Sequence, residues 1–331
     1  MTVSELDTTD PSARRTWFQA QERAIRADRP HALLETFAAF EVAVVEPSDY
    51  YDRAWWQAEV GGEVVGVAQL ELPLTENLDV GWGEVSVVAP HRRRGVGRAL
   101  WDAVARRARE AGRTRVGGEV TVDVSRDPSG SGAARDFAVA MGAEEKHLEH
   151  HLVADLPLRP SVAAPVDAAY RLVTWRGRCP DEHREAYLAM RNQMNVDVPV
   201  GELDLDAAVL DDARLAASEE RLARSYDVRV AAAQRTVDGV FGGYSLLFVP
   251  HGAGHAWQDD TLVMPGHRGH RLGAALKVAN YADLPPTTRL VHTWTAPANA
   301  AMHHTNASLG FRVVEHMYEM EAPIGCVAEG R

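Results

Sequence analysis

The feature that most constrains the fold of this chain is an order of elements that occurs twice within its 331 residues. In both halves, hydrophobic periodicity and turn residues predict helices, a hairpin, a third strand, a basic glycine-containing loop, a helix and further strands. Residues 84–100 and 260–276 align directly at a constant offset of 176. The chemically similar pairs at this offset are Glu84 with Asp260, Val87 with Val263, His91 with His267, Arg92 with Arg268, Gly97 with Gly273, and Leu100 with Leu276. We therefore predict an internal duplication that gives two domains of similar fold.

A segment without hydrophobic periodicity separates the two halves. Residues 158–165 contain two prolines and mostly small side chains, which is typical of a linker. We expect an N-terminal domain over residues 1–156, a linker over 157–168 and a C-terminal domain over 169–331. The chain is long enough to build two hydrophobic cores. Each half is expected to end in a strand, near 143–156 in the first and near 311–321 in the second.

The charge of the chain limits the kinds of partner it can bind. The formal net charge is -12, which argues against a nucleic-acid partner and against an acidic membrane surface. No apolar run approaches the length that spans a membrane. The N-terminus lacks the pattern of a signal peptide, and Cys179 and Cys326 are too few for a disulfide framework. These features predict a cytoplasmic protein.

A basic cluster stands out against this acidic background. Residues 91–97 read His-Arg-Arg-Arg-Gly-Val-Gly and follow an apolar run at 85–90. Residues 98–105 are expected to form a helix. A strand, a glycine-containing loop and a helix in this order present loop N–H groups and the positive end of the helix dipole to one place. The stretch therefore predicts a site for a phosphate-bearing ligand.

The loop also carries a resemblance to a known family. Arg92-Arg93-Arg94-Gly95-Val96-Gly97 resembles the (Gln/Arg)-x-x-Gly-x-(Gly/Ala) pattern of the GNAT superfamily of N-acetyltransferases. Residues 268–273 resemble the same motif, and residues 306–311 resemble the end of the late helix of the family. The whole chain is similar to tandem GNAT proteins, which are frequent in actinobacteria. The resemblance implies the α/β (α+β) class, with two tandem GNAT domains, each a mixed, mostly antiparallel twisted sheet flanked by helices.

The resemblance also implies a cosubstrate, which is acetyl-CoA or another acyl-CoA, and no metal. Its pyrophosphate would lie on the loop N–H groups, and its pantetheine arm would add to the strand edge before each loop. The residues that the resemblance assigns to cofactor binding are Val87, Val88, Arg92, Arg93, Arg94, Gly95, Val96, Gly97 and Arg98 in the first half. In the second half they are Val263, Met264, Arg268, Gly269, His270, Arg271, Leu272, Gly273 and Asn299.

Three positions depart from the family pattern. Arg271 stands where the family usually has its first glycine, where its side chain can crowd the pyrophosphate or grip a phosphate. Ala138 and Asn306 stand where many members have a tyrosine that protonates the leaving thiolate. Alanine has no polar side-chain atom, whereas Asn306 is able to hydrogen-bond the sulfur or the pantetheine arm. These departures predict different roles for the two halves.

Two carboxylates are candidates for the base of an amine acyl transfer. Glu84 and Asp260 hold equivalent places, three residues before the valine that is expected to pair with pantetheine. Each can bind or deprotonate an amine, or can simply form a salt bridge at a strand edge, and the residues alone leave both readings open. Asp259 is a second candidate base. The catalytic candidates are thus Asp260, Asn306 and Glu84.

The resulting hypothesis is an acyl-CoA-dependent N-acyltransferase that acts on a small amine-bearing metabolite, in secondary metabolism. In this hypothesis the N-terminal domain holds acyl-CoA as a structural ligand and the C-terminal domain is catalytic. A non-catalytic acyl-CoA sensor or scaffold, and an O-acyltransferase that uses a longer acyl-CoA, stay open as alternatives. The two halves can imitate the homodimer of single-domain relatives, so the expected state is a monomer or a homodimer.

Overall fold

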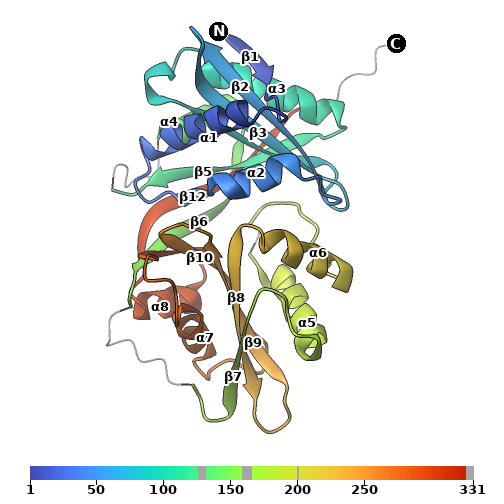
Figure 1. Ribbon diagram of the computed structural model, residues 1–331, viewed down its shortest axis with the longest axis vertical. Helices are drawn as coiled ribbons and strands as arrows, with labels where there is room; N and C mark the ends of the chain where they lie inside the picture. The colour runs from blue at the N-terminus through green and yellow to red at the C-terminus, as the bar shows by residue number, and fades with distance from the viewer. Residues whose placement is uncertain (126–131, 159–165, 200, 326–331) are drawn as a thin grey trace. The chain divides into compact units, whose positions relative to one another are not determined.

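The computed structural model describes residues 1–125, 132–158, 166–199 and 201–325 (Figure 1). The chain forms two compact units, which we call unit 1 and unit 2. Unit 1 contains the described residues of Met1–Leu148, Val200–Asp206 and Glu315–Arg331. Unit 2 contains Glu149–Pro199 and Ala207–Val314. Of the helices in the described ranges, none has the length and apolar character that crossing a membrane requires.

The sheet of unit 1 has the strand order β1-β2-β3-β4-β5-β12. The bounds are β1 (Thr2–Glu5), β2 (Tyr51–Val60), β3 (Glu63–Pro73), β4 (Val80–Val87), β5 (Arg115–Asp123) and β12 (Arg312–Pro323), whose first residues belong to unit 2. The β4–β5 pair is parallel, and the other neighbours are antiparallel. Two strands that run in the same direction therefore lie inside an otherwise antiparallel sheet.

Helices cover both faces of this sheet (Figure 1). The helices of unit 1 are α1 (Pro11–Arg26), α2 (Phe37–Val45), the 3-10 turn η1 (Ala89–His91), α3 (Val96–Glu110) and α4 (Ala133–Ala140). On one face, Leu100 of α3 packs with Ala68 of β3. On the other face, Trp17 of α1 stacks on Phe40 of α2 with ring centroids 4.9 Å apart, in a cluster that includes Val67. Alternate residues of β3 thus enter two different cores, as a strand buried on both faces requires.

Unit 2 repeats this architecture. Its strand order is β6-β11-β10-β9-β8-β7. The strands are β6 (Glu144–Asp155), whose first residues belong to unit 1, β7 (Tyr170–Arg176), β8 (Tyr226–Arg235), β9 (Phe241–Pro250), β10 (His255–Val263) and β11 (Leu290–Thr295). The helices are α5 (Asp181–Asp197), α6 (Asp212–Leu222), α7 (Leu272–Tyr281) and α8 (Ala300–Ser308). The β10–β11 pair is parallel, like β4–β5 in unit 1. Helices α5 and α6 pack on one face through Tyr187 and Leu215, and α7 packs on the other through Leu276.

Each unit takes its closing strand from the other half of the sequence. Strand β12 pairs with β5 from Glu315 opposite Asp123 to Pro323 opposite Arg115, whereas β6 pairs with β11 in unit 2. The units therefore differ from the division into 1–156 and 169–331 that the sequence suggested. The physical reason is that Tyr318 of β12 packs in one apolar cluster with β5 and α4. Of the expected linker, residues 159–165 lie outside the described part of the chain.

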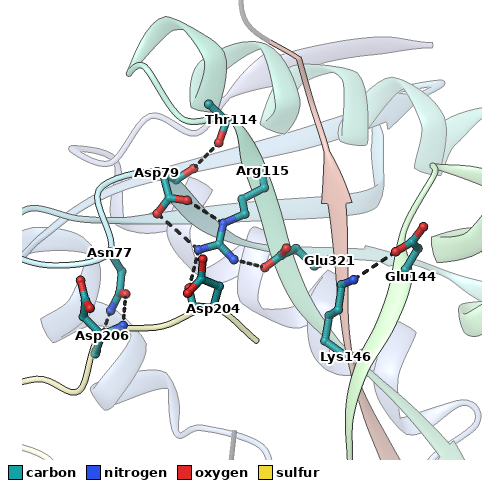
Figure 2. Close-up of polar contacts among 9 residues, drawn as sticks. All are labelled: Asn77, Asp79, Thr114, Arg115, Glu144, Lys146, Asp204, Asp206 and Glu321. Carbon is teal, nitrogen blue, oxygen red and sulfur yellow. Dashed lines mark hydrogen bonds and ion pairs between the residues drawn. The ribbon is translucent and has the colours of Figure 1, made fainter. Parts of the chain in front are cut away.

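Polar contacts attach β12 and residues 201–206 to the rest of unit 1. Figure 2 shows Arg115 of β5 between Asp79 and Glu321 of β12. Its guanidinium lies 2.8 Å from the Asp79 carboxylate and 2.6 Å from that of Glu321. Asn77 and Asp206 exchange two hydrogen bonds, at 2.7 and 3.2 Å, which attach residues 201–206 to the same unit (Figure 2).

Candidate functional site

The basic loop of unit 1 joins β4 to α3, as the sequence predicted. Gly95 has a φ of 83°, in the left-handed region that favours glycine, and is the N-cap of α3 without a side-chain cap. The first hydrogen bond at this end runs from the Ala99 N–H to the Gly95 carbonyl. The N–H groups of residues 96–98 therefore point out of the helix N-terminus, where an anion can accept their hydrogen bonds.

The arginine side chains of this loop make different contacts. The Arg92 Nε donates to the Val87 carbonyl at 2.9 Å and its Nη2 donates to the Ala24 carbonyl at 3.0 Å, while Nη1 is ion-paired with Asp28. Arg92 thus ties the loop to β4 and α1 and is engaged with protein. Arg93 and Arg94 are exposed and lie free to meet a ligand from solvent.

The remaining predicted residues of this loop contribute in different ways. Val96 is 2% exposed and packs in the core with Leu100, so that only its backbone is able to bind a ligand. Gly97 faces the ring of Phe137 in α4, which a Cβ at Gly97 would approach to 3.1 Å. Arg98 is exposed and makes a long contact of 3.5 Å with the Ala140 carbonyl.

The parallel strands β4 and β5 separate just before the loop. They pair only from Val80 to Trp82 of β4. Beyond that point β4 continues to Val87 with β3 as its partner. A Cβ at Gly118 of β5 would lie 2.5 Å from the Gly83 carbonyl oxygen, so the strands are still close there and part afterwards. The edge of β4 that ends at Val87 and Val88 is therefore open toward β5.

Glu84 lies on this open part of β4. Its carboxylate accepts hydrogen bonds from Gln21 at 3.1 Å, Gln69 at 3.0 Å and Ser86 at 3.2 Å. All of these partners are neutral, and within the described residues Glu84 does not form the strand-edge salt bridge that the sequence left as an alternative. None of these three contacts is to a cation, so an amine is able to bind this carboxylate.

Two further carboxylates lie on the strands beside Glu84. Glu119 of β5 and Glu319 of β12 are directly opposite each other. Burial raises the pKa of Glu319 to about 7, and the Glu119 charge adds to the rise. Glu119 is exposed. Desolvation by the protein atoms around its carboxyl group, and then the charge of Glu84, raise its pKa as well. The sequence did not reveal this group, because the pairing of β12 with β5 brings it together.

The second loop follows the backbone path of the first. Arg271 has a φ of 55° and is the N-cap of α7, as Gly95 is for α3. The Arg268 Nε donates to the Val263 carbonyl at 3.3 Å, and its Nη2 lies 3.5 Å from Asp197. These contacts repeat those of Arg92 and confirm the alignment of the two loops at the offset of 176.

Other predicted residues of this second loop serve mainly to position it. The Met264 N–H donates to the Gly242 carbonyl at 2.9 Å, and His270 Nδ1 lies 2.7 Å from the Asp167 carboxylate. Leu272 is 1% exposed and enters the core under α7. Gly269 has a φ of 89°, which glycine adopts without strain.

Strands β10 and β11 separate as β4 and β5 do. They pair from His255 to Trp257, and a β-bulge follows between Gln258 and Thr261. Asp260 lies in this bulge, where its carboxylate accepts a hydrogen bond from the Tyr244 hydroxyl at 2.6 Å and lies 3.3 Å from the Arg191 guanidinium. Asp260 thus takes part in an ion pair. Burial and the charge of Asp260 raise the pKa of the neighbouring Asp259.

The two asparagines of the late helix are both engaged. Asn306 is fully buried; its Nδ2 donates to Thr295 Oγ1 at 3.0 Å and its Oδ1 accepts from Lys277 Nζ at 2.6 Å. It is an interior anchor, not an amide open to a ligand. Asn299 is exposed and caps α8, since its Oδ1 accepts from the Met302 N–H at 3.1 Å. Its amide nitrogen is still available to a pantetheine carbonyl.

Two further observations concern the rest of the described residues. Within those ranges, no group of three or more His, Cys, Asp or Glu side chains is placed to hold a metal ion. A hollow of about 280 Å³ is lined by β1 and α3, with Val3, Trp56 and Arg106 in its wall. Its lining includes no residue of the basic loop and no residue of the open β4 edge. The candidate site rests on the loops and the diverging strands described above.

Comparison with known proteins gives the fold and one domain a family likeness. Residues 14–129 match the acetyltransferase (GNAT) family. A tandem GNAT protein from the clavulanic acid biosynthesis pathway is 28% identical to the chain, with a TM-score of 0.81 over 98% of this chain and 99% of that one. No match is found among curated proteins. Residues 14–129 thus match a GNAT acetyltransferase domain, and the likeness of the whole chain to a tandem GNAT protein indicates an acyltransferase.

More distant structures show the same fold over the whole length. A GCN5-related N-acetyltransferase from Sphaerobacter thermophilus has a TM-score of 0.69 at 14% identity, over 98% of this chain and 96% of that one. A putative acetyltransferase from Pyrococcus horikoshii has a TM-score of 0.58 at 11% identity, over 99% and 94%. The repeated architecture is the fold of a tandem GNAT protein. The GNAT family uses acetyl-CoA.

Proposed function

We propose that this protein transfers an acyl group from acetyl-CoA, or another acyl-CoA, to the amine of a small metabolite. The observation that carries the proposal is the repeated combination of an uncapped helix N-terminus and a pair of parallel strands that separate beside it. The helix end suits the pyrophosphate of coenzyme A. The separated strands leave an edge along which a peptide-like pantetheine arm is able to pair.

The contacts of unit 1 support a specific path for this arm. The Val88 N–H donates to the Val65 carbonyl in β3 at 2.9 Å, so the groups of Val87 point to the opposite, open edge. Arg92 occupies the Val87 carbonyl and leaves the Val87 N–H for the cosubstrate. Arg93 and Arg94, both exposed, add positive charge near the phosphates.

We infer that unit 1 holds acyl-CoA as a structural ligand and that unit 2 carries out the transfer. Ala138, at the family's proton-donor position, packs in an apolar cluster of unit 1. The equivalent Asn306 belongs to a buried polar network in unit 2. Asp260 binds or orients the acceptor amine in this proposal. Asp259, with its raised pKa, supplies a base that accepts a proton near neutral pH.

A second candidate function is a non-catalytic acyl-CoA sensor or scaffold. The absence of a tyrosine at both Ala138 and Asn306 favours it. The relative from the clavulanic acid pathway points instead to an acceptor in secondary metabolism. A panel of small amines and alcohols, assayed for CoA release and for acylated product by mass spectrometry, separates these functions. Amine-dependent release supports the transferase, and tight binding of acyl-CoA without release over the whole panel supports the sensor.

A further inference from the structure

The sheet of unit 2 carries two tryptophans that the proposed function has not used. Trp257 of β10 and Trp294 of β11 are both partly exposed to solvent. Their ring centroids lie 6.3 Å apart, and the planes of the rings are inclined by 83°. Two nearly perpendicular indole rings that solvent reaches form an aromatic corner, which a small ligand is able to enter. We use this name for the pair of Trp257 and Trp294.

The strand register places both rings on the face of the sheet that α5 covers. Trp257 is opposite Phe248 of β9, and both belong to the apolar cluster that contains Tyr187 of α5. On the other side of β10, Trp257 pairs with His292, two residues before Trp294. Side chains two residues apart on a strand point to the same face. The two indole rings are therefore neighbours on one surface of unit 2.

The β-bulge of β10 adds two carboxylates beside the aromatic corner. The register of β10 with β9 shifts there, so that Asp259 and Asp260 together oppose Leu246. Leu246 belongs to the same cluster as Trp257. Asp259 is partly exposed and comes two residues after Trp257, which is about 7 Å along a strand. Aromatic rings and carboxylates thus lie close together at the point where β10 and β11 separate.

The charges beside the aromatic corner favour a cation. The Arg191 guanidinium lies 3.3 Å from Asp260, so the two charges of this pair balance. The Asp259 carboxyl group interacts with the Asp260 N–H, and no side chain of the described residues hydrogen-bonds to it. Burial raises the pKa of Asp259, and the charge of Asp260 adds to the rise. An ammonium group beside Asp259 would offset this effect, because an opposite charge stabilises an ionised carboxylate.

Buried side chains hold the two rings in place. His151 of β6 is fully buried and stacks on Trp294, with ring centroids 4.4 Å apart and planes inclined by 5°. The Nε2 atom of His151 lies 2.9 Å from His292 Nδ1, and this hydrogen bond fixes the imidazole. The ring of Phe248 lies 5.1 Å from that of Trp257. The aromatic corner is therefore formed before a ligand arrives, which lowers the entropic cost of binding.

Unit 1 provides an internal comparison. In each unit a tryptophan lies at the end of the pairing between the two parallel strands, Trp82 in β4 and Trp257 in β10. Two residues beyond the partner of this tryptophan, the neighbouring strand carries Glu119 in unit 1 and Trp294 in unit 2. The second indole ring is thus a feature of unit 2, and Glu119 marks the matching place in unit 1.

We propose that Trp257 and Trp294 bind the ammonium group of the acceptor in unit 2, and so select a basic aliphatic amine over an alcohol or an arylamine. This inference rests on the proposed function. The faces of an aromatic ring carry negative partial charge that attracts a cation, and tryptophan attracts it most strongly. An aliphatic amine, like the side chain of lysine, is protonated near neutral pH. Such an acceptor arrives as a cation and gives its proton to Asp259 before acyl transfer.

The test compares two probes of the same shape and different charge. One is choline, and the other is its neutral carbon analogue, in which a tert-butyl group replaces the trimethylammonium group. Both are titrated by calorimetry into the full-length protein saturated with coenzyme A, which has no acyl group to transfer. Choline should bind to the wild type about 10-fold more tightly than the neutral analogue. Equal affinities for the two probes would overturn the proposal.

Variants assign the preference for choline to the aromatic corner. Trp257→Leu and Trp294→Leu should each reduce this preference to about 2-fold or less, and Trp294→Phe should keep part of it, because phenylalanine attracts a cation less strongly. The ratio of the two affinities guards against a general loss of structure, which weakens both probes alike. Trp101→Leu, in α3 of unit 1, is the matched control and should bind as the wild type does.

Glu119→Gln tests the matching place in unit 1 and should also keep the preference. If Glu119→Gln loses the preference for choline and Trp294→Leu retains it, the cation site belongs to unit 1 and the proposal is overturned.

These binding measurements do not depend on turnover, so the two proposals can fail separately. A preference for choline that Trp294→Leu abolishes, without CoA release over the amine panel, supports the cation site and counts against the proposed transferase alone. Where an amine does release CoA, Trp294→Leu should raise the KM for that amine by about 10-fold and leave the KM for acyl-CoA unchanged. An unchanged KM for the amine would refute the role of Trp294 in binding the acceptor.

Discussion

Arg92 donates a hydrogen bond from its Nε to the carbonyl of Val87 at 2.9 Å, and so closes the basic loop onto the strand that precedes it. The contact recurs in the second half, where Arg268 donates to the carbonyl of Val263 at 3.3 Å. In both copies the first basic residue of the motif builds the loop. The N–H groups and the exposed side chains that follow are left for the ligand.

Arg92→Met should therefore weaken both the fold and cosubstrate binding. Loss of hydrogen bonds from a charged donor that is 30% exposed is expected to lower the free energy of unfolding by about 1–3 kcal/mol. Chemical unfolding and titration with acetyl-CoA measure the two effects. Arg94→Met is the control, because its exposed side chain should affect affinity alone. Equal stability of Arg92→Met and the wild type would contradict the role of Arg92 in building the loop.

A reciprocal exchange at the helix N-caps tests the two loops. Gly95→Arg places a side chain on a left-handed residue and should lower the free energy of unfolding by about 1–2 kcal/mol. It should also reduce acetyl-CoA binding to unit 1. Arg271→Gly keeps the backbone path and should change stability by less than about 1 kcal/mol. Native mass spectrometry counts the bound acetyl-CoA in each variant, and undiminished occupancy in Gly95→Arg would speak against the loop as the pyrophosphate site.

An ion pair between Arg29 and Glu315 attaches β12 to the N-terminal part of unit 1. Glu315 of β12 is fully buried and receives two hydrogen bonds from Arg29, at 2.9 and 3.0 Å. Arg29→Met removes this bidentate partner from a buried carboxylate and should cost about 3–5 kcal/mol. The double variant Arg29→Met with Glu315→Met should recover most of the loss. Urea unfolding tests this, and an Arg29→Met protein as stable as the wild type would show that the pair does not hold β12 in unit 1.

The carboxylates on β5 and β12 predict a pH dependence of stability. The pKa of Glu319 rises from 4.5 to about 7. The stability that this group contributes is therefore fully present below pH 4.5 and is lost as the pH rises through about 7. Glu319→Gln should exceed the wild type by about 1 kcal/mol at about pH 8, after allowance for partial exposure, and should gain little at about pH 4. Urea unfolding at the two pH values decides this, and an equal gain at both would be inconsistent with the raised pKa.

The sequence predicted the elements that local chemistry determines. The strand before each loop, the loop itself and the helix after it were all expected from an apolar run, glycine or its substitute, and helical periodicity. The structure confirms these elements in both halves. The constant offset also predicted correctly that Arg271 stands where Gly95 does.

The sequence does not predict which strands pair with each other or which distant side chains meet. Periodicity predicted strands near 143–156 and 311–321, but it does not say which sheet a strand joins. The pairing of β12 with β5 therefore came as a finding, and with it the group of Glu84, Glu119 and Glu319. Likewise, nothing local to Lys277 indicates burial, because its partner Asn306 is far away in the sequence.

The division of labour between the units is the central claim, and one comparison tests it most directly. CoA release with an accepted amine is measured for Asp260→Asn and Glu84→Gln, with melting temperatures to confirm that both variants fold. We expect Asp260→Asn to abolish turnover and Glu84→Gln to retain it. Loss of turnover in Glu84→Gln alone would contradict the account and would assign the chemistry to unit 1.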